Sequence, residues 1–274
     1  MKILAAVVAA CVLAANALAQ DAGADKWDAR LTAVTGEVVV HPAGGGDEVA
    51  GEPDMPLEEG DRVTTSADST AEISLDGKSL ISLRESSDFT LENTQKSASI
   101  FSLSLGSILA KIEHLGDRSM NVKSPTSVAA VRGTEFGVDV EGDNSHVGVF
   151  DEGRVEVTGA LGGKEVLTPN QETSVARGQA PTRAAALKRF AARRALMAAH
   201  RQRMAIVRRN WKALPPAQRR AARANALKRA RQRRLNRMRR RQGQTPEYRR
   251  RQRKPVQPRR KKKAGRKPNR KENP

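Results

Sequence analysis

Between residues 31 and 177, apolar and polar side chains alternate with a period of two over short stretches, and turn residues interrupt them every eight to twelve positions. Such alternation places apolar side chains on one face of a strand and polar ones on the other. Asp76-Gly77 lies between two of these stretches and predicts a hairpin. The pattern predicts an all-β domain over residues 31–178, as a jelly-roll-like sandwich or a short solenoid-like stack.

A different pattern begins at residue 179. Alanine, arginine and leucine dominate residues 183–214, and one apolar residue recurs every seven positions: Phe190, Met197, Met204 and Trp211. Thr182 is expected to cap this helix, and Pro215-Pro216 to end it. The narrow stripe predicts packing on the β domain or a coiled coil with a second copy. A basic amphipathic helix lying on an anionic membrane is the alternative.

A second helix with a weaker stripe (Leu227, Leu235, Met238) is predicted from residue 217 to about 241, so that residues 179–241 form a basic α-helical region. Beyond it the chain is rich in proline, glutamine, arginine and lysine. Such a composition cannot bury enough apolar surface to fold alone. Residues 242–274 are therefore predicted to form a disordered polycationic tail.

The N-terminus has the pattern of a cleaved signal peptide over residues 1–19, followed by a linker over residues 20–30. A basic Lys2 precedes a short apolar stretch, and Ala17-Leu18-Ala19 is a small-x-small cleavage signature. An uncleaved anchor and a lipidated Cys11 are the alternatives. Cys11 is the only cysteine, so the mature chain is expected to have no disulfide. No later stretch approaches eighteen apolar residues, which predicts a periplasmic protein, envelope-associated or secreted, without a further membrane span.

The formal net charge of +20 is divided between two opposite halves. Residues 20–180 hold 13 Lys/Arg and 28 Asp/Glu, whereas residues 181–274 hold 36 Lys/Arg and only 2 Asp/Glu. An asymmetry of this size predicts an acidic domain and a basic segment with different partners.

The basic segment is expected to bind an anionic envelope polymer or membrane surface: lipopolysaccharide, phospholipid or acidic glycan. Nucleic acid is the alternative, although few aromatic residues accompany the charge. The segment could also fold back on the acidic domain, bridge copies of the chain or contact another envelope protein. The predicted polyanion-binding residues are Arg249, Arg250, Arg251, Arg253, Lys254, Arg259, Arg260, Lys261, Lys262, Lys263, Arg266 and Lys267.

Four short motifs follow one another in the acidic half. They are Gly60-Asp61-Arg62-Val63-Thr64-Thr65, Leu105-Gly106-Ser107-Ile108-Leu109, the stretch from Ser124-Pro125 to Val131-Arg132-Gly133-Thr134-Glu135-Phe136, and Phe150-Asp151-Glu152-Gly153-Arg154-Val155. In this order they resemble the FecR domain of bacterial envelope proteins, over about residues 31–177. We expect the motif residues to be mainly structural: Gly60, Asp61, Arg132, Gly133, Thr134, Phe136 and Gly153.

The founding members of the family that this chain resembles regulate iron-chelate uptake. They combine a cytoplasmic anti-sigma segment, a transmembrane helix and a periplasmic sensing domain. With a signal peptide and no internal span, the chain is expected to lack the first two, so the resemblance implies the domain without the whole signalling circuit. It implies a non-catalytic binding or scaffold module, with an accessory sensor in envelope signalling as an alternative.

Arg132-Gly133-Thr134 itself has two interpretations. Arg132 could be a ligand-binding cation beside Glu135. Alternatively, Gly133 supplies a backbone conformation free of side-chain clashes, Thr134 hydrogen-bonds a local backbone group, and Arg132 pairs with a carboxylate on a neighbouring strand. We favour the structural interpretation, under which Arg132→Ala lowers the melting temperature.

Catalytic signatures are missing from the sequence. The four histidines (His41, His114, His146 and His200) have no metal-ligand spacing, and neither a nucleophile elbow nor a phosphate-binding glycine loop is present. Asp139, Glu141 and Asp143 could hold Ca²⁺, but they lack the glycine and the final glutamate of an EF-hand loop. We expect no enzyme activity, no metal and no cofactor.

Overall fold

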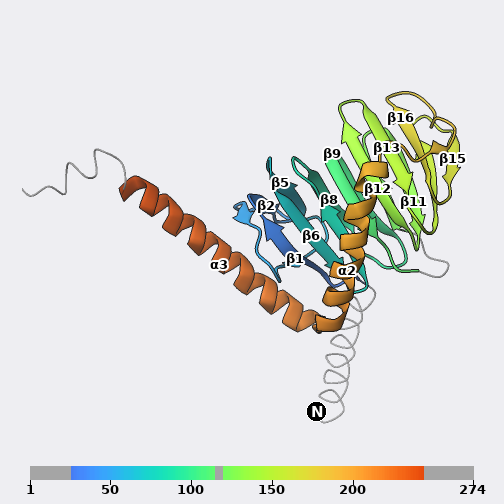
Figure 1. Cartoon of the computed structure of the whole chain (residues 1–274). Coiled ribbons are helices and arrows are strands. Elements are labelled where there is room, and N and C mark those ends of the chain that lie inside the picture. Colours follow the sequence, from blue (N-terminus) through green and yellow to red (C-terminus); the bar gives the residue numbers. More distant parts are fainter. Residues whose placement is uncertain (1–25, 115–119, 244–274) are drawn as a thin grey trace, which may run out of the picture. The chain divides into compact units, whose positions relative to one another are not determined.

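The computed structural model describes residues 26–114 and 120–243, and it confirms the all-β prediction (Figure 1). The described residues form 17 strands, a short 3₁₀ helix and two α-helices. The strands are β1 (Ala29–Thr35), β2 (Val38–His41), β3 (Val49–Ala50), β4 (Pro56–Leu57), β5 (Arg62–Thr65), β6 (Thr70–Leu75), β7 (Ser79–Leu83), β8 (Asp88–Asn93), β9 (Ser99–Lys111), β10 (Met120–Lys123), β11 (Ser127–Arg132), β12 (Glu135–Glu141), β13 (Asn144–Val149), β14 (Arg154–Gly159), β15 (Lys164–Leu167), β16 (Gln171–Ala176) and β17 (Ala185–Ala186). The helices are η1 (Ala191–Arg193), α2 (Arg194–Asn210) and α3 (Pro216–Gly243).

The strands form two sheets that share β9. Sheet I has the order β4-β1-β6-β7-β9-β12-β13-β16-β17, with every neighbouring pair antiparallel. Sheet II has the order β3-β2-β5-β8-β9-β10-β11-β14-β15, in which β9 and β10 are parallel and the other pairs antiparallel. The 13-residue β9 passes from sheet II to sheet I near Gly106, whose φ is +88°. The predicted hairpin at Asp76-Gly77 is confirmed, because β6 and β7 pair on either side of it.

The main hydrophobic core lies between the two sheets, and a smaller cluster around Phe190 lies on the outer face of sheet I. Alternate residues of β12, such as Phe136, Val138 and Val140, are fully buried in the main core, as are Ala129 and Val131 of β11. The intervening residues of β12 are buried as well, because the outer face of sheet I is also covered. Burial on both faces explains why β12 departs from the simple alternation of the other strands.

Residues 179–234, which we call the strap, run along the edge of sheet I and then cross its outer face as α2 (Figure 1). The strap ends with the first part of α3, whose Ala226 and Ala230 pack against the main core. The predicted helix start at Thr182 is wrong. Thr182 lies against β16, where its Oγ1 accepts the Ser174 N–H (3.1 Å) and its carbonyl accepts the Thr173 hydroxyl (2.6 Å). The next residues extend this edge as β17, so the α-helical conformation begins only at Arg194.

The seven-residue stripe faces the β domain of the same chain. Met197 and Met204 of α2 are buried, and α2 contacts β7 and β9. Trp211, just after α2, packs so closely on the β6–β7 turn that a Cβ on Gly77 would lie 2.6 Å from the Trp211 Cβ. The Arg30 guanidinium lies 4.3 Å from the centroid of the same indole, within the range of a cation–π contact.

Phe190 anchors the strap in a notch that two glycines form. Gly137 of β12 and Gly148 of β13 are directly opposite each other in sheet I. A Cβ added to either would lie 2.7 Å or 2.5 Å from the Phe190 ring, which is fully buried. Phe150 packs edge-on against that ring at a centroid distance of 6.2 Å. The two missing side chains therefore make the space that the ring fills.

Helix α3 adds small side chains to the main core rather than a long apolar stripe. Ala226 and Ala230 are buried there, and Leu227 is partly buried against it. Leu235 and Met238, by contrast, are about half exposed. Of the described residues, those up to Arg234 form one compact unit, and the rest of α3 belongs to a second unit. None of the helices in the described ranges is long and apolar enough to cross a membrane.

Gly137→Ala tests whether the Phe190 ring needs the space that the two glycines leave. The new methyl group must displace the Phe190 ring, and loss of a buried phenylalanine costs about 3–5 kcal/mol. For a unit of this size we expect the melting temperature to fall by about 6–20 °C, measured by differential scanning calorimetry. The same substitution in a Phe190→Leu background should cost less, because the smaller side chain leaves room. An unchanged melting temperature for Gly137→Ala would contradict the notch.

Candidate functional site

Arg132-Gly133-Thr134 is the corner at which the chain passes from sheet II to sheet I. Strand β11 ends at Arg132 in sheet II, and β12 begins at Glu135 in sheet I. Gly133 has a φ of +58°, and a Cβ there would lie 2.8 Å from the His114 Cα. Both the backbone angle and the close approach of another segment require glycine at this position.

Thr134 links this corner by hydrogen bonds to the second corner, at Gly153-Arg154. Its buried hydroxyl lies 3.2 Å from the carbonyl oxygens of Arg132 and Arg154, and it accepts the Arg154 N–H (3.1 Å). Arg154 starts β14, where the chain has returned from sheet I to sheet II. Gly153 precedes it with a φ of +94°, and any Cβ there would clash with the Thr134 hydroxyl. The hydroxyl thus fixes two crossovers relative to each other.

The two charged residues of this motif have different environments. Glu135 is 1% exposed, and its carboxylate accepts hydrogen bonds from Lys111 Nζ (2.8 Å) and from Arg201 Nη1 of α2 (2.6 Å). Arg132 is exposed and lies opposite Arg154 in the register of β11 and β14. The expected pairing of Arg132 with a carboxylate is not found among the described residues. Phe136, which follows, is a core residue.

Asp61 is a buried carboxylate that the strap neutralises. Its side chain is fully buried and accepts the backbone N–H groups of Ala43 and Glu58, both at 2.9 Å. Arg223 of α3, itself 7% exposed, reaches it with both terminal nitrogens, at 2.5 Å and 2.6 Å. The preceding Gly60 turns the chain with a φ of +85°. A bidentate guanidinium–carboxylate pair of this kind fixes orientation as well as charge.

Asp139 of β12 is the third buried carboxylate with a partner in the strap. Arg189 Nε donates to its Oδ2 (3.0 Å), and Arg193 and the Ser107 hydroxyl (2.6 Å) both bond to Oδ1. Burial raises the pKa of Asp139, but the hydrogen bonds from Arg193 and Ser107 outweigh it and hold the pKa below its ordinary value. Asp139 is therefore an ionised residue in the strap interface.

His200 of α2 holds the middle of the strap against β7 by two hydrogen bonds. Its Nε2 donates to the Leu80 carbonyl (2.9 Å) and its Nδ1 accepts the Ser82 hydroxyl (2.9 Å). Burial lowers the pKa of His200, although the Leu80 carbonyl, Glu72 and Glu135 act in the opposite direction. The neutral imidazole satisfies both hydrogen bonds and needs no counter-ion.

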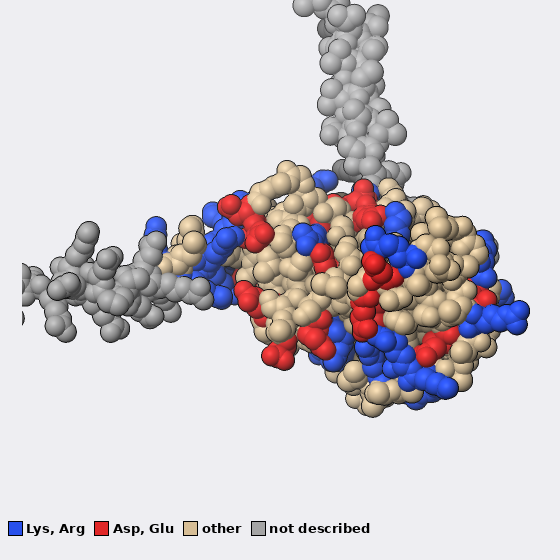
Figure 2. All heavy atoms as spheres, turned by 90° about the horizontal axis from the view of Figure 1, so that it is seen from above, with Lys and Arg blue, Asp and Glu red and all other residues tan. Residues whose placement is uncertain are grey.

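The strap offsets the charge of the acidic domain. Residues 181–234 contain 18 Lys/Arg and no Asp/Glu, so residues 20–234 together have a net charge of only +3. Residues 235–274 hold the other 18 basic residues against 2 acidic ones, a net charge of +16. Figure 2 shows acidic and basic side chains side by side on the face in view. Further strap arginines that pair with acidic residues of the β domain are Arg194, Arg203, Arg208, Arg229 and Arg233.

The twelve predicted polyanion-binding residues, from Arg249 to Lys267, lie outside the described residues. The predicted Ca²⁺ alternative has no support, because no group of three or more His, Cys, Asp or Glu in the described ranges could hold a metal ion. Asp139 and Glu141 instead share Arg189.

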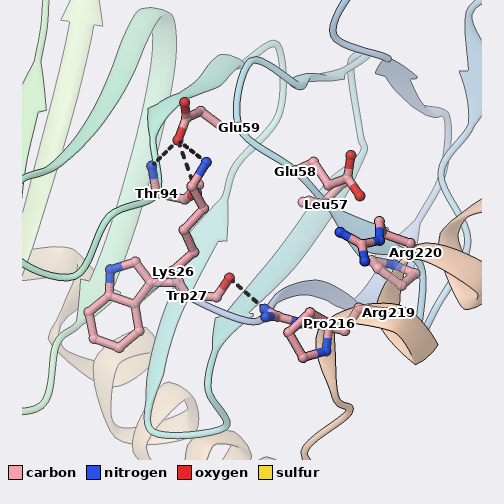
Figure 3. Close-up of a pocket in the computed structure, with 10 residues that line it drawn as sticks. Lys26, Trp27, Leu57, Glu58, Glu59, Thr94, Pro216, Arg219 and Arg220 are labelled. Atoms are coloured by element: carbon pink, nitrogen blue, oxygen red, sulfur yellow. Dashed lines mark hydrogen bonds and ion pairs between the residues drawn. The ribbon is translucent and has the colours of Figure 1, made fainter. Parts of the chain in front are cut away.

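A pocket of about 420 Å³ lies between the N-terminal end of the β domain and the start of α3 (Figure 3). Glu59 in its wall pairs with Lys26 (3.1 Å) and accepts the Thr94 N–H (3.3 Å). The Trp27 carbonyl accepts a hydrogen bond from Arg219 (3.2 Å). The hydrogen bond from Lys26 lowers the pKa of Glu59. These polar groups satisfy one another, which leaves few of them for a ligand.

Comparison with known proteins agrees with the arrangement of the motifs. Residues 61–156 match the family model described as FecR protein. The chain contains a FecR domain. The matched range runs from the buried Asp61 to Glu156 of β14. It is shorter than the expected 31–177, although strands on both sides of it belong to the same two sheets.

Two crystal structures, at 1.65 Å and 2.50 Å resolution, resemble part of this chain. Both are described as a "putative anti-sigma factor" from Parabacteroides distasonis. Each has 14% sequence identity and a TM-score of 0.42, over 47% of this chain and 61% of the other. The chain thus spans less than two thirds of that protein, and a likeness this distant carries no information on function. No curated protein matches the chain.

The importance of the Asp61–Arg223 pair can be tested with Arg223→Met. This substitution leaves a buried carboxylate without its cation, which costs about 3–5 kcal/mol. We expect a fall in melting temperature of about 6–20 °C by calorimetry. Lys228→Met, at an exposed position of the same helix, serves as the control and should change it little. Equal effects of the two substitutions would contradict the role given to the buried pair.

Proposed function

We propose that the chain is an exported, non-catalytic FecR-domain protein of the periplasm, whose residues 235–274 bind an anionic polymer or lipid of the cell envelope. Binding tethers the domain to the envelope, where it acts as a binding or scaffold module. The tail is the electrostatic anchor, and the strap is part of the folded domain.

The distribution of charge carries this proposal. The compact unit has almost no net charge, because the strap arginines pair with its carboxylates. The net charge of +16 in residues 235–274 has no such internal counterpart in the sequence. Each Lys or Arg near an anionic membrane surface contributes about 1 kcal/mol, so partial engagement of the tail is enough for firm binding.

The choice of an envelope partner rests on two further observations. The N-terminal sequence has the pattern of an export signal, and residues 61–156 of the folded part match the FecR family. Nucleic acid attracts a polycation by the same electrostatics, so it enters the test as a competitor. The FecR match also favours a second candidate function, that of an accessory sensor in envelope signalling.

The proposal is tested by replacing four cations of the tail, Arg260, Lys261, Lys262 and Lys263, with glutamine. Co-sedimentation of the full chain with lipopolysaccharide, and with vesicles of phosphatidylglycerol and phosphatidylcholine, measures the affinity. We expect the variant to bind at least tenfold more weakly than wild type, because four contacts of about 1 kcal/mol are removed. Wild-type binding should weaken steeply as salt is added.

The matched control removes the same charge from exposed positions of the compact unit: Arg209, Lys212, Lys228 and Arg231, each changed to glutamine. It should bind nearly as well as wild type. Equal losses in the two variants, or binding that ignores salt, would contradict the tail as anchor. Tighter binding of the wild type to short duplex DNA at the same salt would contradict the envelope partner.

A further inference from the structure

A small hollow on the outer face of sheet II is formed by four residues in two neighbouring strands. Ala130 and Arg132 point outward from β11, and they lie in register with Glu156 and Arg154 of β14. The hollow they line has a volume of about 290 Å³. Ala130 is the smallest of the four side chains, and the two arginines and Glu156 stand around it.

The two arginines are exceptional among the cations of the β domain. Every other described Lys or Arg before residue 180 pairs with a carboxylate; these are Lys26, Arg30, Arg62, Lys78, Arg84, Lys96, Lys111, Lys123, Lys164 and Arg177. Arg132 and Arg154 have no ion pair within the described ranges. Unpaired arginines are unexpected in a region with 28 acidic and 13 basic residues.

The arrangement also has an electrostatic cost. Like charges directly opposite each other on neighbouring strands destabilise a sheet. The backbones of both residues are nevertheless held by one hydroxyl, that of Thr134, which bonds to the Arg132 carbonyl and to the Arg154 N–H. Both guanidinium groups also attract the Glu156 carboxylate and contribute to the lowering of its pKa, but neither forms an ion pair with it. The backbone of each arginine is fixed, and an anionic ligand between the two guanidinium groups would add a direct attraction to both.

Glu156 supplies a different kind of contact. Its Oε1 accepts a hydrogen bond from Lys164 (2.7 Å), which lowers the pKa of Glu156. The side chain is therefore ionised at neutral pH, and Oε2 can accept a hydrogen from a ligand hydroxyl. The volume of the hollow is close to the lower end of the range for small-ligand sites, roughly 300 Å³, so it suits a molecule of monosaccharide size.

We propose that Arg132 and Arg154 bind the carboxylate or phosphate of a small polyhydroxylated ligand, an acidic sugar, while Glu156 accepts a hydrogen from one of its hydroxyl groups. Planar guanidinium groups match the geometry of both anions, which lysine does not. This site is independent of the tail. It assigns the exposed arginine of the corner to ligand binding, and Gly133 and Thr134 to holding that arginine in place.

The experiment uses the full chain with four probes at constant, near-physiological ionic strength: glucuronate, glucose 6-phosphate, glucose and acetate. Ligand-detected NMR and the ligand-induced rise in melting temperature measure binding. We expect glucuronate or glucose 6-phosphate to bind with a Kd of about a millimolar, and glucose and acetate to bind at least tenfold more weakly. Binding of only one of the two acidic sugars would identify the anion as carboxylate or phosphate.

Arg132→Gln and Arg154→Gln should each weaken binding of the acidic sugar at least tenfold, and Arg132→Lys should recover only part of it. Without ligand, the melting temperature of Arg132→Gln should stay within about 2 °C of wild type, since no ion pair is lost. The tail variant Arg260, Lys261, Lys262 and Lys263→Gln should bind the sugar like wild type.

Three results would overturn the proposal. The first is a failure of both acidic sugars to bind better than acetate and glucose. The second is a loss of sugar binding in the tail variant but not in the arginine variants. The third is a large fall in the melting temperature of ligand-free Arg132→Gln, which would show that the guanidinium is a structural group.

Discussion

Three buried carboxylates of the β domain, Asp61, Glu135 and Asp139, depend on arginines that come from the strap. Each is at most 1% exposed, and a buried carboxylate without a cation is strongly unfavourable. Among the described residues, Asp61 and Asp139 have only strap arginines as cations, whereas Glu135 also pairs with Lys111 of β9. Exposed ion pairs contribute little to stability, so the many arginine contacts on the surface of the strap matter less than these three. The buried pairs fix where the strap lies, whereas Phe190 in its glycine notch and the apolar stripe of α2 supply the hydrophobic contact. The folded unit therefore extends well past the last long strand, to Arg234.

This dependence changes the meaning of the charge asymmetry. The basic half of the sequence is two segments with different tasks, one that offsets the acidic domain and one that retains a net charge of +16. The residues of the corner at Arg132-Gly133-Thr134 also have two different roles. Gly133 and Thr134 are explained by backbone geometry and hydrogen bonds, whereas the Arg132 side chain lies on the uncovered side of the corner opposite Arg154.

Much of the fold could be predicted from local pattern. The alternation and the Asp76-Gly77 hairpin predict an all-β fold, because strand and turn preferences act over a few residues. The order of the four motifs indicates the FecR domain. The start of the helix could not be predicted at Thr182, because pairing along the edge of β16 overrides the helix preference of the alanines and arginines. Partners such as Asp61 and Arg223 lie 162 positions apart, and no local pattern links them. Gly137 and Gly148 were a possible signal for close packing, but only the register shows them side by side.

Native-state hydrogen exchange of the full chain tests most directly whether the strap belongs to the folded domain. The amides of α2 between Met197 and Val207 should open with nearly the same free energy as those of β12, because loss of the strap leaves Glu135 and Asp139 buried without their strap arginines. Fast exchange of α2 at rates close to those of a free helix, with β12 still protected, would contradict the account. It would mean that the β domain holds its buried carboxylates without the strap.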